Sequence, residues 1–195
     1  MSAGVATVRF TTRWPWNPAS LLVARCTGGK QFSHTMLLAD GRAYEASMVH
    51  GCRVVDVDTA MRGVVAYQDM AVPVPDLAAC IAFGQAQAGK GYDWRGALSL
   101  PFLASERWEH DGRWWCSELT FAQLGAGGAW VLDPDERTRV TPNDLRQAPY
   151  PKSPLVRVRQ PGSTSGPLKR AFFRAEGQPV THAADAAPVQ SSAKD

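Results

Sequence analysis

Residues 31–49 read "QFSHTMLLADGRAYEASMV" and hold the clearest local signal in the sequence, two β-prone runs on either side of Asp40-Gly41. Asp-Gly is a favoured pair for the two-residue turn of a tight β-hairpin. With that turn, Ala39 pairs with Arg42, and the pairing of every residue further along both strands follows from it. The stretch therefore predicts an antiparallel hairpin whose register decides which side chains share a face.

This register places a histidine and a carboxylate on the same face. Side chains alternate along a strand, so one face is expected to carry His34, Met36, Leu38, Ala43, Glu45 and Ser47. Glu45 is then the diagonal neighbour of His34, within reach of its ring. A bulged three-residue loop would change the parity and separate the two side chains. The sequence predicts a His34–Glu45 pair on the condition that the turn has two residues.

Strand and helix signals continue on both sides of the hairpin. Strands are expected in the alternating or β-branched runs 4–14, 52–58, 63–72 and 154–160. Helices are expected at 17–29, at 74–89 with Asp76 as the cap, and at 116–128 with an end at Gly125. The connection 90–112 is rich in aromatic and loop-forming residues, and we expect mostly loop there.

Composition indicates a globular domain followed by a tail. The chain has 195 residues, of which 45% are hydrophobic and 20% charged, as is typical of a protein with a sizeable core. We expect residues 1–160 to form one domain. Residues 161–195 are rich in Gly, Ser, Pro, Ala and Gln and are predicted to be mostly disordered. Within this tail, the basic-aromatic stretch "PLKRAFFRAEG" is a candidate docking patch for other proteins of an assembly.

Charge and hydrophobicity argue against two classes of partner. The net charge is +3 and the basic residues are scattered, so we expect no nucleic-acid partner. No apolar run is long enough to span a bilayer, so we expect no integral membrane segment. The first residues, "MSAGVATVRFTT", lack the basic and apolar regions of a signal peptide, which favours synthesis in the cytoplasm.

The four cysteines lie in dissimilar contexts, at Cys26, Cys52, Cys80 and Cys116. No two of them form a Cys-x-x-Cys motif, and core packing is the expected role of the first three. His50 beside Cys52 supplies too few ligands for a metal, so we expect no metal and no cofactor. In "RWWCSEL", by contrast, Cys116 begins a predicted helix.

A helix N-terminus and a nearby imidazole both lower the pKa of a thiol. Cys116 is therefore a candidate nucleophile, with His34 as its base and Glu45 as the carboxylate that orients the histidine. The residues alone leave a second interpretation open. Cys116 would then be a core thiol, His34 a strand histidine bonded to backbone, and Glu45 a solvated charge.

The order of the motifs resembles a known family. The stretches "SHTMLL", "DGRAYEAS", "GCRVVDV", "GKGYDW" and "WWCSEL" are similar, in order and spacing, to the circularly permuted, YiiX-like branch of the NlpC/P60 papain-like cysteine hydrolases. The resemblance covers about residues 17–125. It implies an α+β, permuted papain-like fold, in which an antiparallel sheet packs against the helix that carries the cysteine.

By position, the resemblance makes Cys116 the nucleophile, His34 the general base and Glu45 the group that orients His34. It also gives the backbone N–H of Cys116 a place in an oxyanion hole. Expected substrate-binding or bracing positions are Tyr92, Asp93, Trp115 and Ser117. Trp115 stands where the family usually has tyrosine, so a hydroxyl is missing there.

The activity that the resemblance implies is hydrolysis of amide bonds through an acyl-enzyme, with peptidoglycan stem peptides or another peptide as substrate. The expected absence of a signal peptide favours a phage-tail or lysis component, or a protein delivered to the periplasm, that binds assembly proteins through its C-terminal tail. Two alternatives stay open. One is a lipid amidase, esterase or acyltransferase of the same fold, although those relatives commonly have a second histidine in place of Glu45. The other is a non-catalytic structural or binding component of a phage-like assembly.

Overall fold

The computed structural model of the protein describes residues 2–13, 32–94, 112–133 and 140–158. The helix expected at 17–29, most of the connection 90–112 and the C-terminal tail lie outside these residues. The strands are β1 (Gly4–Arg13), β2 (His34–Ala39), β3 (Arg42–Ser47), β4 (Gly51–Asp56), β5 (Val64–Val74), β6 (Gly91–Tyr92), β7 (Arg113–Trp114) and β8 (Val156–Arg157). The helices are α2 (Val57–Ala60), α3 (Leu77–Gln87), α5 (Cys116–Ala126) and α6 (Pro142–Gln147).

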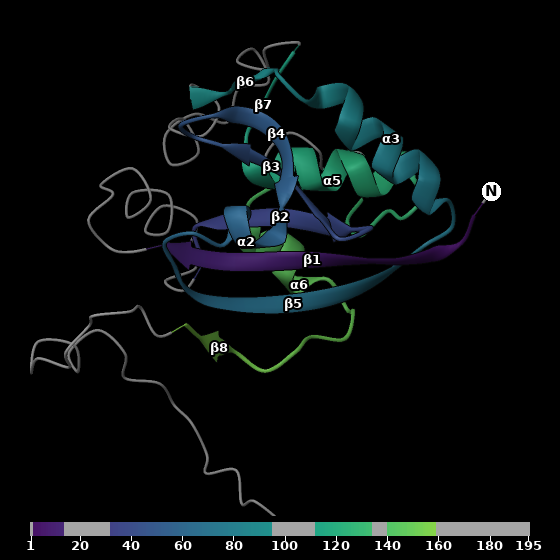
Figure 1. Ribbon diagram of the computed structural model, residues 1–195. Helices are drawn as coiled ribbons and strands as arrows, with labels where there is room; N and C mark the ends of the chain where they lie inside the picture. The colour runs from purple at the N-terminus through teal and green to yellow at the C-terminus, as the bar shows by residue number, and fades with distance from the viewer. Residues whose placement is uncertain (1, 14–31, 95–111, 134–139, 159–195) are drawn as a thin grey trace, which may run out of the picture. The chain divides into compact units, whose positions relative to one another are not determined.

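Six of the strands form one antiparallel sheet in the order β4-β3-β2-β1-β5-β8 (Figure 1). Alternation along β1 explains how the sheet meets its core, because Ala6, Val8 and Phe10 are completely buried on one face. The expected strands at 4–14, 52–58 and 63–72 are confirmed as β1, β4 and β5. The architecture is α+β with a mostly antiparallel sheet. Within the described residues, no helix combines the length and the hydrophobicity needed to cross a membrane.

The hairpin has the predicted register. Ala39 pairs with Arg42, and Leu38 pairs with Ala43. Asp40 and Gly41 have φ angles of 49° and 70°, the left-handed pair that a type I′ turn requires. The turn therefore has two residues, and the side-chain parity predicted from the sequence is confirmed.

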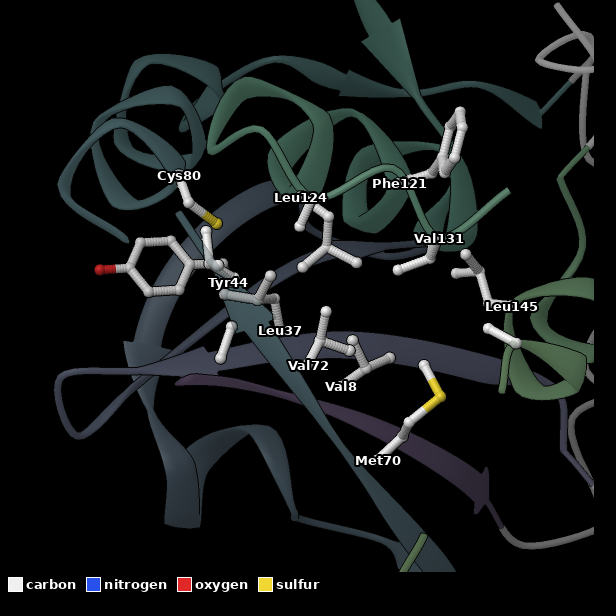
Figure 2. Close-up of a cluster of buried hydrophobic side chains, with 14 of the residues drawn as sticks. Val8, Leu37, Tyr44, Met70, Val72, Cys80, Phe121, Leu124, Val131 and Leu145 are labelled. Carbon is white, nitrogen blue, oxygen red and sulfur yellow. The ribbon is translucent and has the colours of Figure 1, made fainter. Parts of the chain in front are cut away.

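Helices α3 and α5 pack on each other and cover one face of the sheet (Figure 1). Figure 2 shows side chains from the sheet, among them Val8, Leu37 and Val72, facing Leu124 of α5 and Cys80 of α3. The carboxylate of Asp76 caps α3, as predicted, by accepting the Ala79 N–H at 3.2 Å. Burial of this shared apolar surface holds α5 at a fixed place over the sheet.

Gly84 lets the two helices approach closely. A Cβ atom at this position would lie 2.8 Å from Cδ1 of Tyr44 and would also collide with the side chain of Gln123 in α5. Any side chain here would push α3 away from the sheet and from α5.

The β2–β3 hairpin has a second face, on the side away from α3 and α5, and this face is covered as well. The short helix α2, which the sequence did not predict, places Ala60 against Met36 and Ala43 in a second buried cluster. The face that carries His34 and Glu45 is therefore inside the protein rather than in solvent, and Glu45 is 0% exposed.

A two-residue parallel ladder joins β6 and β7, with Gly91 opposite Arg113 and Tyr92 opposite Trp114. The sequence predicted mostly loop over 90–112 and no strand at 113–114, because so short a ladder leaves no periodic signal. The start of the segment is tied to β4, where Cys52 N–H donates to the Lys90 carbonyl at 2.8 Å. The β6–β7 ladder places the residues that follow β6 beside the start of α5.

Candidate active site

The central pair of the site is His34 and Glu45. His34 opens β2 and Glu45 lies in β3, and the register between the strands brings Nε2 of the histidine to 2.7 Å from Oε2 of the carboxylate. The predicted pairing is confirmed. The side chain of His34 is 12% exposed, whereas that of Glu45 is fully buried. Solvent therefore does not contact the carboxylate directly.

Arg53 binds the other oxygen of the carboxylate. It lies directly opposite Glu45 in the β3–β4 ladder, and its Nε and Nη2 both donate to Oε1, the former at 2.8 Å. Burial acts to raise the pKa of Glu45, but hydrogen bonds to His34 and Arg53 and the charges of both outweigh it and lower the pKa to about 2. Glu45 is therefore ionised at any ordinary pH.

Arg13 places a second cation near the same carboxylate. Its Nη2 is 3.7 Å from Oε2 of Glu45 and donates to the Ala60 carbonyl at 2.9 Å. Its Nη1 donates to the Arg62 carbonyl at 3.1 Å. Arg13 thus joins the end of β1 to the chain around α2 and adds positive charge beside Glu45.

Cys116 is the first residue of α5, and its thiol lies within the electrostatic influence of the His34 ring. Because Nε2 of His34 faces Glu45, Nδ1 is the ring nitrogen left for the sulfur. Burial acts to raise the pKa of Cys116. The hydrogen bond and charge of His34, together with the backbone N–H groups of Thr35 and Ser117, outweigh burial and lower the pKa.

The pKa of His34 changes in the opposite direction to that of Cys116. Burial acts to lower the pKa of His34, but hydrogen bonds to Cys116 and Glu45 outweigh it and raise the pKa to about 9. A lowered thiol pKa and a raised imidazole pKa together favour transfer of the proton from sulfur to nitrogen. The resulting thiolate–imidazolium pair would be the nucleophilic form of a cysteine–histidine site.

The other described cysteines behave as core residues. Cys52 and Cys80 are buried and reduced, and burial raises the pKa of each to about 11. This matches their expected role in packing. Among the described cysteines, Cys116 is the one whose pKa is lowered, while Cys26 lies outside the described residues.

Trp115 and Ser117, two of the expected substrate-binding residues, flank the cysteine and are themselves buried. Nε1 of Trp115 and Oγ of Ser117 both donate to the carbonyl of Val140, at 3.1 and 2.6 Å. Thr120 Oγ1 donates to the Cys116 carbonyl at 3.0 Å. These bonds brace the first turn of α5 against the chain before α6.

Tyr92 and Asp93, the other two expected residues, reach the site through the β6–β7 ladder. Asp93 N–H donates to the Trp114 carbonyl at 3.1 Å, and Tyr92 packs in one buried cluster with Trp115. Burial, followed by the nearby charge of Cys116, raises the pKa of Tyr92, so its hydroxyl stays protonated. Trp94 meets the Tyr92 ring edge-on at 5.3 Å and is 41% exposed.

Sequence reasoning did not find Arg53 and Arg13. Alternation along β4 indicates which side chains share a face with Arg53. Pairing Arg53 with Glu45 also requires the length of the turn that sets Ser47 opposite Gly51. Arg13 follows a register shift between Thr12 and Arg13, and no sequence pattern marked this irregularity.

In the parts of the chain that the structure describes, no three His, Cys, Asp or Glu side chains are grouped so that they could hold a metal. The cluster combines a thiol of lowered pKa, an imidazole of raised pKa and a buried carboxylate. The chain matches no family model and no curated protein.

Proposed function

We propose that this protein is a cysteine hydrolase that cleaves amide bonds through an acyl-enzyme on Cys116. The observation that carries the proposal is the arrangement of Cys116, His34 and Glu45, in which His34 hydrogen-bonds to a buried, ionised carboxylate and acts to lower the pKa of the thiol. Cys116 is the nucleophile, His34 the general acid and base, and Glu45 the group that orients His34 and stabilises its protonated ring.

The first half-reaction forms a thioester. The thiolate of Cys116 attacks the carbonyl carbon of the amide, and a C–S bond forms as the carbonyl oxygen takes the negative charge. The C–N bond then breaks, and the His34 imidazolium gives its proton to the departing amine. The backbone N–H of Cys116, at the start of α5, is the proposed donor to the oxyanion.

The second half-reaction restores the enzyme. Neutral His34 takes a proton from a water molecule, whose oxygen attacks the thioester carbon. The C–S bond breaks, the acid product leaves, and the thiolate–imidazolium pair is formed again. Glu45 keeps one ring nitrogen bonded throughout, so the imidazole presents the other to the sulfur and to the water.

The fold supports a relationship to the permuted NlpC/P60 branch. The strand with the histidine precedes the helix with the cysteine, and that helix packs on a mostly antiparallel sheet. On this basis the proposed substrate is the peptide of peptidoglycan, and the proposed setting is a phage-tail or delivered cell-wall hydrolase. Glu45, where lipid-acting relatives commonly have histidine, favours the peptide substrate.

The direct test measures newly released amino groups from purified peptidoglycan, with phospholipid vesicles as a parallel substrate. Cys116→Ala is expected to lower the rate by about 10³-fold or more. Cys52→Ala is the matched control, because it removes a buried thiol of raised pKa, and it should keep most of the activity. Acyl release from phospholipid alone would move the substrate to the lipid class. Undiminished activity of Cys116→Ala, or no release from either substrate, would contradict the proposal.

A further inference from the structure

One group in direct contact with the Cys–His–Glu cluster has no role in the steps above. Arg53 donates twice to Oε1 of Glu45, while His34 occupies Oε2. The carboxylate is 0% exposed, whereas the Arg53 side chain is 21% exposed. Arg53 thus separates a buried charge from solvent at the edge strand β4.

A buried carboxylate needs both charge compensation and hydrogen bonds on each oxygen. Of the described groups around Glu45, Arg53 alone donates to Oε1, because Arg13 lies nearer the other oxygen, at 3.7 Å, and gives its N–H groups to two carbonyls. Without Arg53, Oε1 would be buried and unpaired. The carboxylate would then gain by turning or by taking up a proton, and either change weakens its bond to His34.

We propose that Arg53 is a positioning residue, which keeps Glu45 ionised and in one orientation so that Oε2 stays on His34. The inference rests on the proposed function, since it assigns Arg53 to the same nucleophilic site. Arg53 acts through Glu45 and has no contact with the reacting atoms.

The charges that face the cluster give the direction of the effect. Cys116 and His34 form one pair of opposite charges, and Glu45 and Arg53 form a second, with Arg13 beside the carboxylate. Removal of the Arg53 charge leaves the Glu45 charge less compensated beside the thiolate and the imidazolium. An ionised Glu45 with less compensation disfavours the thiolate, and a turned or protonated Glu45 stabilises the His34 cation less. In either case the acid limb of a pH profile should move to higher pH.

The experiment follows alkylation of Cys116 by iodoacetamide from pH 4 to pH 10, with the site of modification read by peptide mapping. Arg53→Gln should move the acid limb up by roughly 0.5–1 pH unit, the effect of one charge several ångströms away. Arg53→Lys, which keeps the charge, should bring the acid limb most of the way back to its wild-type position.

The matched control is Arg42→Gln. Arg42 makes a cross-strand ion pair with Asp56 on the same two strands, at 3.3 Å, but both side chains are well exposed. Its loss should leave the profile unchanged. An Arg53→Gln profile that coincides with wild type in a folded protein would overturn the inference and leave the proposed function intact. A wild-type Cys116 with no acid limb below that of a free thiol would overturn the proposed function itself.

A second comparison covers the case in which Arg53→Gln does not fold. The double variant Glu45→Gln/Arg53→Gln removes both charges of the ion pair, which buried sites tolerate better than one uncompensated charge. If Arg53 acts through Glu45, this variant and Glu45→Gln should be alkylated at pH 6 within about two-fold of each other. A further ten-fold fall in the double variant would show that Arg53 acts by its own charge and would overturn the positioning role.

Discussion

The hydroxyl of Ser117 donates to the carbonyl oxygen of Val140 at 2.6 Å, and this bond fixes the first turn of α5 to the chain that precedes α6. The residue that follows the candidate nucleophile therefore has two separate contacts. Its side chain holds the helix in place, and its backbone N–H acts to lower the pKa of the Cys116 thiol. The two contacts can be tested independently, because a substitution changes only the first.

Ser117→Ala is expected to lower the free energy of unfolding by about 1 kcal/mol, since it removes one buried hydrogen bond while Trp115 still serves the same carbonyl. The pH dependence of Cys116 alkylation should not change, because the backbone N–H remains. Urea denaturation and the alkylation profile measure the two quantities. A shifted profile would mean that the hydroxyl, rather than the backbone, acts on the sulfur.

His34→Ala should leave Cys116 buried without its cation. Burial then acts on the thiol without the opposing charge, so its pKa should rise, and alkylation at pH 6 should fall by about 100-fold or more. The control is His50→Ala, which removes an exposed histidine three residues from Arg53. If Cys116 of His34→Ala is alkylated as fast as in wild type, the thiolate does not depend on His34.

Glu45 should make the stability of the protein depend on pH in acid. Its pKa is about 2 in the folded protein, against an ordinary value of 4.5, so its contribution is complete above pH 4.5 and is lost as the pH falls toward 2. That contribution is roughly 3 kcal/mol. Denaturation at pH 3 and pH 7 should show about 2 kcal/mol of this loss in wild type, because the carboxyl of the folded protein is still mostly ionised at pH 3.

In Glu45→Gln, the part of the acid loss due to this carboxyl should be absent, and stability at pH 7 should be lower because Arg53 loses its partner. Asp56→Asn is the matched control, since Asp56 is an exposed carboxylate paired with an arginine in the same ladder. It should reproduce the wild-type pH dependence. An unchanged acid slope in Glu45→Gln would mean that Glu45 is not the group responsible.

Gly84→Ala tests the approach of α3 to α5. At an exposed position inside a helix, this change raises the free energy of unfolding by about 1 kcal/mol through helix propensity. Here the added Cβ meets Tyr44 and Gln123, so we expect a net loss of about 1–2 kcal/mol, measured by urea denaturation. Ala86→Gly, at an exposed position of the same helix, is the propensity control and should cost about 1 kcal/mol. A stabilised Gly84→Ala protein would show that the helices have room to separate.

Local chemistry explains which features could be predicted from sequence. The turn at Asp40-Gly41 specifies its own geometry, and the parity of the hairpin then places His34 beside Glu45 without any knowledge of the rest of the chain. The cap at Asp76 is a local signal of the same kind. The helix that begins at Cys116 continues one residue beyond its predicted end, to Ala126.

The features that sequence reasoning missed depend on distant parts of the chain. Arg53 reaches Glu45 only because β4 pairs with β3 in one register, and α2 is too short to leave a periodic pattern. The parallel ladder of β6 and β7 joins Gly91 to Arg113 across a long connection. Neither residue predicts the other, because the ladder depends on where β4 and α5 already lie.

The opposite pKa shifts of Cys116 and His34 affect how the protein exchanges protons with solvent when it folds. In the unfolded chain near pH 8, the thiol keeps its proton and the imidazole has none, whereas in the folded protein the lowered pKa of Cys116 and the raised pKa of His34 favour the proton on nitrogen. The number of protons bound by the two groups is then the same in both states. Between about pH 6.5, the ordinary pKa of histidine, and pH 9, a thiolate–imidazolium pair is therefore formed on folding without uptake or release of a proton, so its formation does not depend on pH in that range.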